Sequence, residues 1–94
     1  MKTIYKYKVP VKDRFFLRLP VGAEILTVQT QYGEVAMWAI VDNNAEKEMR
    51  EFRVAGTGHD LMKAVNEEFK YIGTFQLYEG KFIGHMFEVI QCQK

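Results

Sequence analysis

Gly56-Thr57-Gly58-His59-Asp60 is the segment of this chain whose residue types are best suited to chemistry. Two glycines let the backbone turn its N–H groups toward one point, and a helix that begins just after them adds a partial positive charge. Thr57 supplies a hydroxyl group and His59 a ring N–H. The segment predicts an anion or phosphate site. The simpler interpretation is that the glycines only permit a sharp turn between a strand and a helix.

Basic side chains near the start of the chain extend this predicted site. Arg14 and Arg18 carry guanidinium groups, which bind phosphate strongly through paired hydrogen bonds. If the first two strands pair as a hairpin, these arginines share one sheet face with Phe16, Lys6 and Lys8. The alternative is an ordinary solvated face. A formal net charge of +1 lacks the basic excess of nucleic-acid-binding proteins, so we expect no nucleic-acid partner.

The remaining reactive residues predict neither a metal site nor an enzyme. The chain holds two histidines and one cysteine, Cys92, which cannot form an internal disulfide. His85 shares a strand face with apolar residues, which is typical of a hydrogen-bonded core histidine. No serine is present, and Thr57 is too close to His59 in sequence to pair with it as a nucleophile and base. We therefore expect no cofactor and no catalysis.

Apolar side chains recur at every second position in most of the chain, which predicts strands. The expected strands cover residues 3–9, 14–19, 24–31, 35–41 and the region around 52–54. Two hairpins are expected, one with Tyr32-Gly33 at its tip and one closed by a tight two-residue Glu79-Gly80 turn. Between them, the spacing of Leu61, Met62, Val65 and Phe69 predicts a short helix capped by Asp60.

These elements predict a single domain over residues 1–94. It is mainly β, an antiparallel sandwich or small barrel of about seven strands with one short helix. The strand at 35–41 is apolar on both faces, so we expect it to be central and Trp38 to lie in the core. Edge strands favour a homo-oligomer. No apolar run approaches the roughly 20 residues that span a bilayer, so we expect no membrane partner and a cytoplasmic location.

Several blocks resemble a family of short, uncharacterised proteins encoded by bacteriophages and prophages. The blocks are Ile4–Tyr7, Leu19–Gln29, Trp38–Asp42, Phe52–His59 and Tyr71–Gln76. The resemblance implies a setting rather than a chemistry: an accessory protein, such as a counter-defence protein, in the cytoplasm of an infected host cell. It supplies no catalytic residues.

Two functions are consistent with these observations. The first is a non-catalytic protein that sequesters a phosphate-bearing ligand, such as a cyclic-nucleotide immune signal, through Gly56, Thr57, Gly58, His59, Arg14 and Arg18. The second is a protein–protein inhibitor that docks on a host defence or transcription protein. Its anchors would be exposed aromatic residues, namely Tyr5, Tyr7, Phe16 or Tyr32. A structural virion component is a third interpretation.

Overall fold

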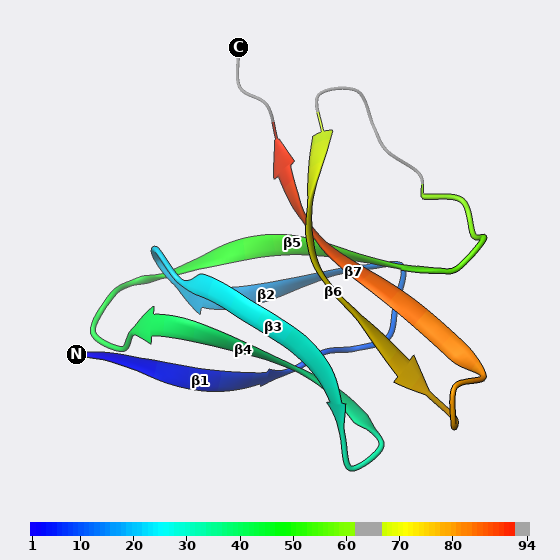
Figure 1. The fold of residues 1–94 in the computed structure, drawn as a ribbon. Helices are drawn as coiled ribbons and strands as arrows, with labels where there is room; N and C mark the ends of the chain where they lie inside the picture. The colour runs from blue at the N-terminus through cyan, green and yellow to red at the C-terminus, as the bar shows by residue number, and fades with distance from the viewer. Residues whose placement is uncertain (62–66, 92–94) are drawn as a thin grey trace.

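The described residues form seven strands joined by turns and loops (Figure 1). The computed structural model describes residues 1–61 and 67–91. The strands are β1 (Lys2–Lys8), β2 (Arg14–Pro20), β3 (Glu24–Gln31), β4 (Glu34–Asp42), β5 (Lys47–Gly56), β6 (Glu67–Leu77) and β7 (Phe82–Gln91). The alternation in the sequence thus predicted the first five strands within a few residues of their bounds, although β5 begins earlier than expected.

The strands form two antiparallel sheets that pack as a sandwich. One sheet has the order β1-β4-β3, and the other has the order β2-β5-β7-β6. The mainly β, antiparallel character is therefore confirmed. As its apolar sequence predicted, β4 is the central strand of the three-stranded sheet. At one side of the sandwich β3 lies beside β6, so the two sheets contact each other there.

The core fills the space between the sheets with one face of each strand. Its largest fully buried side chains are Leu19, Met37, Val41, Phe52 and Met86. Phe15 of β2 stacks on Phe52 of β5 with 5.4 Å between the ring centroids. Trp38 differs from the expectation, because it alternates with the buried residues of β4 and lies half-buried on the outer face, opposite Lys6.

The residues of the predicted short helix that the structure describes do not lie in a helix. Phe69 lies in β6, where it pairs with Val89 of β7, and Leu61 has no regular secondary structure. Met62 and Val65 lie outside the described residues. The spacing of the apolar residues did not separate helix from strand, since residues four apart in sequence also share a face of a strand.

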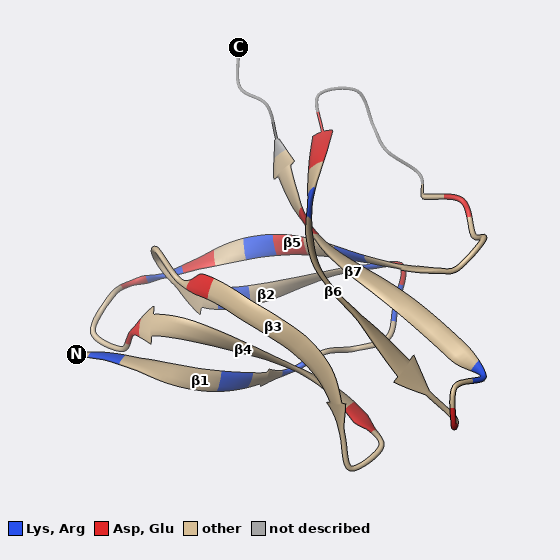
Figure 2. Ribbon diagram, in the orientation of Figure 1, with Lys and Arg blue, Asp and Glu red and all other residues tan. Residues whose placement is uncertain are grey.

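The first two strands do not pair as a hairpin. β1 belongs to the three-stranded sheet and β2 to the four-stranded sheet. Lys6 and Lys8 therefore do not share a sheet face with Arg14, Phe16 and Arg18, and the predicted continuous basic surface is wrong. Figure 2 shows both charge signs together on β5 and β6, whereas in the three-stranded sheet the basic residues lie on β1 and the acidic residues on β3 and β4.

Both predicted hairpins are present, but only one has the expected turn. Tyr32 and Gly33 form a two-residue connection between β3 and β4, with φ values of 52° and 79°. The β6–β7 connection instead has four residues, Tyr78 to Lys81, and its first three have positive φ. Hydrogen bonds within it, such as that from Gly80 N–H to the Leu77 carbonyl, hold the longer loop closed.

Candidate functional site

The Gly56–His59 turn lies at the end of β5, and two of its backbone amides already have partners. Thr57 N–H donates to the carbonyl of Ile83 at 3.3 Å, and His59 N–H donates to the carbonyl of Gly56 at 3.0 Å. An anion at this turn would have to compete with both bonds.

The two glycines of the turn have different structural roles. Gly58 has φ of 85°, a conformation that glycine adopts at low cost. Gly56 is required by close packing, because a Cβ atom there would lie 2.7 Å from the ring of His59 and 3.3 Å from the ring of Phe82. Both glycines therefore have a structural explanation that needs no ligand.

The two predicted arginines both lie in β2, but at different distances from the Gly56–His59 turn. Arg14 pairs with Arg53, close to the end of β5, whereas Arg18 pairs with Met49 near its beginning. Arg14 also donates from Nε to Glu51 Oε2 at 2.5 Å. The register does not bring Arg18 to the turn, so the predicted residues do not form one pocket. Capture of a phosphate-bearing ligand stays a prediction.

His85 is hydrogen-bonded as expected, but it lies half-buried on the outer face of the four-stranded sheet. Its Nε2 lies 2.7 Å from the hydroxyl of Thr57, and its Nδ1 lies 3.0 Å from the hydroxyl of Thr74. Thr74 in turn lies 2.5 Å from the hydroxyl of Tyr71. This chain of hydrogen bonds ties the turn after β5 to β7 and β6.

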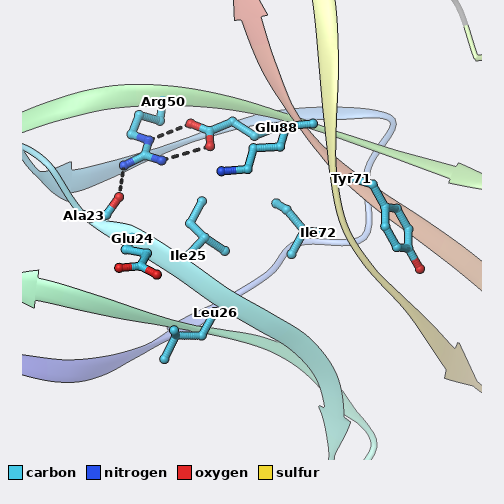
Figure 3. A pocket seen from close by; sticks show the side chains of 9 residues that line it. Ala23, Glu24, Ile25, Leu26, Arg50, Tyr71, Ile72 and Glu88 are labelled. Atoms are coloured by element: carbon cyan, nitrogen blue, oxygen red, sulfur yellow. Dashed lines mark hydrogen bonds and ion pairs between the residues drawn. The ribbon is translucent and has the colours of Figure 1, made fainter.

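A small polar pocket of about 110 Å³ lies where β3 meets β6 (Figure 3). Arg50 fills one side of it and makes a bidentate ion pair with Glu88, at 2.6 Å from Nε and 2.9 Å from Nη2. Its Nη1 donates to the carbonyl of Ala23 at 2.7 Å. Hydrogen bonding to Glu88 raises the pKa of Arg50 above its ordinary value. Because these groups bind each other, we assign the pair a structural role: it fastens the start of β3 to the other sheet.

The most exposed aromatic residues of the described chain lie at the tips of the two hairpins. Tyr32 is 96% exposed and Tyr78 is 73% exposed. Their φ values are 52° and 55°, in the left-handed region that bulky residues rarely adopt. Figure 1 shows the β3–β4 and β6–β7 tips at the same end of the sandwich. Two tyrosines are thus presented to solvent by strained turns at one end of a rigid scaffold.

An open groove of about 300 Å³ lies between these tips, and we call it the hairpin-tip groove. It is lined by Lys8, Val9, Pro10, Val11, Gly33, Glu34, Val35, Leu77 and Tyr78. Its floor is apolar, with Val9, Val35 and Leu77 almost fully buried. The N–H of Val9 donates to the carbonyl of Val35 at 3.0 Å, which holds this side of the floor against β4.

The rim of the groove carries one positive and one negative side chain, together with one exposed apolar side chain. Lys8 Nζ lies 3.8 Å from Glu34 Oε1, and both side chains are mostly exposed. Val11 is 47% exposed. A second hollow of about 360 Å³ shares Lys8, Glu34 and Val35 with the groove and reaches Tyr32.

One hydrogen bond links the two hairpins near their tips. The hydroxyl of Thr30 donates to the carbonyl of Gln76 at 2.6 Å. Thr30 lies two residues before Tyr32, and Gln76 lies two residues before Tyr78. The bond therefore fixes the position of one tyrosine relative to the other, and Thr30 is a positioning residue for the groove.

Sequence reasoning identified one of these tyrosines and missed the other. Tyr32 is one of the four predicted aromatic anchors, because aromatic residues dominate the energetics of interfaces. Tyr78 is not among them, since the predicted turn contains only Glu79 and Gly80. The signal that could have found it is a tyrosine one or two residues ahead of the turn glycine in each hairpin.

Two further properties concern only residues 1–61 and 67–91. Among them, no group of three or more histidine, cysteine, aspartate or glutamate side chains is placed to hold a metal ion. They also contain no helix with the length and apolar character needed to cross a membrane.

Fold and site together define an antiparallel β-sandwich domain with an open groove between two tyrosine-bearing hairpin tips at one end. Residues 1–94 match the DUF7352 family, described as a domain of unknown function, and the chain belongs to this family. No curated protein and no solved structure is significantly similar to the chain.

Proposed function

We propose that the protein is a non-catalytic binding module that docks onto another protein through the hairpin-tip groove. The observation that carries this proposal is Tyr32. Its ring has almost no packing within the chain, and its backbone adopts a conformation that costs free energy for a tyrosine. A large aromatic residue in this position contributes little to the fold, whereas it is well suited to a partner.

The groove also defines the chemistry of its occupant. Tyrosines supply rigid contact area with one apolar and one polar part, as they do in antibody loops. The apolar floor of the groove, which Tyr78 borders, suits one or two apolar side chains, and the Lys8–Glu34 pair at the rim suits flanking polar groups. Tyr32 borders the neighbouring hollow, which shares this rim. The proposed partner therefore presents an exposed loop or extended segment with an apolar residue at its centre.

The resemblance to phage and prophage proteins supplies the proposed setting. In this proposal the module acts in the cytoplasm of an infected bacterium, where it occupies a host defence or transcription protein.

Site-specific photo-crosslinking in bacterial cells tests the proposal. A benzophenone amino acid is placed at position 32, at position 78, or at position 71 as a control. Tyr71 is an exposed tyrosine on the outer face of the four-stranded sheet. We expect one bacterial protein to be crosslinked from both 32 and 78 and not from 71.

A second variant connects the crosslink to the groove itself. Val11→Glu places a charge at the exposed apolar position of the rim, where the fold should tolerate it. We expect this variant to lose the crosslinks from positions 32 and 78. Equal crosslinking from position 71, or crosslinks that persist in Val11→Glu, would refute docking at the groove.

A further inference from the structure

The edge strand β2 leaves part of its backbone without a partner strand. Among the described strands it pairs only with β5, in a register without a bulge. Just beyond its end, Val21 N–H donates to the carbonyl of Glu46 at 2.7 Å. Because backbone groups alternate along a strand, the odd-numbered residues of β2 also face β5. The N–H and C=O groups of Phe16 and Arg18 therefore point outward from the sheet edge.

The side chains at this edge combine an exposed ring with an available cation. Phe16 is exposed, and the guanidinium of Arg14 lies 5.1 Å from its ring centroid. Arg14 is also ion-paired with Glu51. Arg18 is exposed and has no hydrogen bond or ion pair to any other residue that the structure describes. Its charge is available to a group outside the chain.

We infer that β2 pairs in antiparallel fashion with β2 of a second copy, in a register centred on Leu17. This register sets Phe16 opposite Arg18 of the second copy, and the two residues exchange backbone hydrogen bonds across the edge. The guanidinium can then lie over the ring of Phe16, as that of Arg14 already does within one chain. The two-fold axis makes the contact twice and closes the dimer.

Repulsion between like charges selects this register over its neighbours. A register centred on Phe16 would set Arg14 opposite Arg18 of the second copy. A register centred on Arg18 would set that residue opposite its own copy. Both arrangements place two cations directly across from each other, which is unfavourable.

The register centred on Leu17 also buries apolar surface on the inner face of the sheet. Leu17 is half-buried and packs against the core at the open edge of the sheet. In the dimer it faces Leu17 of the second copy, so apolar surface at the edge of the core is removed from water.

The other sheet edges are less suited to pairing between copies. At β1, Val9 N–H donates to β4, so alternation places Ile4 and three lysines, Lys2, Lys6 and Lys8, at the free edge. Lysines at an edge oppose strand addition. The edges of β3 and β6 lie beside each other within one chain. The second copy is therefore assigned to β2.

A charge-swap experiment tests this assignment by sedimentation over a series of protein concentrations. Phe16→Lys sets a lysine opposite Arg18 of the second copy, and we expect it to abolish the dimer. Adding Arg18→Glu to that variant restores an attractive pair, and we expect the dimer to return. Ile4→Lys adds the same charge at an exposed position on the β1 edge and serves as the matched control, with no expected change.

Amide hydrogen exchange provides a second test at single residues. In the wild type, protection of the Phe16 and Arg18 amides should rise with protein concentration, while the amides of Phe15 and Leu17, which face β5, should stay constant. Together with the charge-swap rescue, this pattern would establish the β2 interface. A wild type that is monomeric at every concentration, or a dimer that persists in Phe16→Lys, would overturn the inference.

Discussion

Replacing Tyr32 with asparagine should stabilise the protein while removing its proposed anchor. The side chain is 96% exposed, so the substitution loses almost no packing. The φ of 52° at this position, followed by 79° at Gly33, is the pattern of a turn that favours Asn-Gly. Residues held in sparsely populated backbone regions cost about 1–3 kcal/mol, and asparagine tolerates this region better than tyrosine. We expect a gain of about 1 kcal/mol, because asparagine relieves only part of that cost.

Equilibrium unfolding in urea measures this gain, and a thermal scan should show a rise in Tm of about 4–8 °C for a domain of this size. Tyr32→Ala is the matched control. It removes the ring but keeps a residue that also disfavours positive φ, so its stability should stay close to that of the wild type. Both variants should lose the proposed partner. A Tyr32→Asn protein that is clearly less stable than the wild type would refute the reasoning from backbone strain.

Three further substitutions test the packing and charges of the sandwich. Glu88→Ala leaves the partly buried guanidinium of Arg50 without its carboxylate. We expect the free energy of unfolding, measured in urea, to fall by about 2–3 kcal/mol. An unchanged urea midpoint would contradict the structural role of the pair. Gly84→Ala places a Cβ 2.5 Å from the buried ring of Phe75 and should cost about 1–3 kcal/mol by the same assay, whereas a neutral result would show that the ring can move. A backbone hydrogen bond and nearby positive charge lower the pKa of Asp42. Its carboxylate therefore stabilises the fold above the unfolded-state pKa of about 3.9, and this contribution is lost as the pH falls through the lower folded-state pKa. Asp42→Asn should therefore weaken the fall of the urea midpoint on acidification below about pH 4, and an identical pH profile would argue against this contribution.

The proposed site could be predicted only in part, because its two halves come from distant parts of the chain. Tyr32 is recognisable from the Tyr-Gly pair between two alternating segments. The groove beside it needs Val9 from the linker after β1 and Leu77 from the end of β6. No local pattern connects these residues, since their proximity depends on how the two sheets stack.

The predicted phosphate site has a clear local sequence pattern, but the fold uses its backbone groups for other bonds. The Gly-Thr-Gly-His segment contains the residue types of an anion site, but those types do not reveal whether its amides are free. In the fold, Thr57 N–H bonds to Ile83, which lies in the following hairpin. That bond is set by the pairing of β5 with β7, which the sequence pattern does not specify.

Alternation of side chains along the sequence by itself determined that the chain is an antiparallel β protein, where most of its strands lie, and which strand is central. These features follow from contacts within a strand or across a short turn, where every second side chain must face the core. Only the tertiary structure decided that β1 and β2 join different sheets, that Phe69 of the expected helix lies in a strand, and that two tyrosine-bearing tips flank one groove. Those features depend on long-range strand pairing and on the burial of whole faces, and a period of two is compatible with many such pairings.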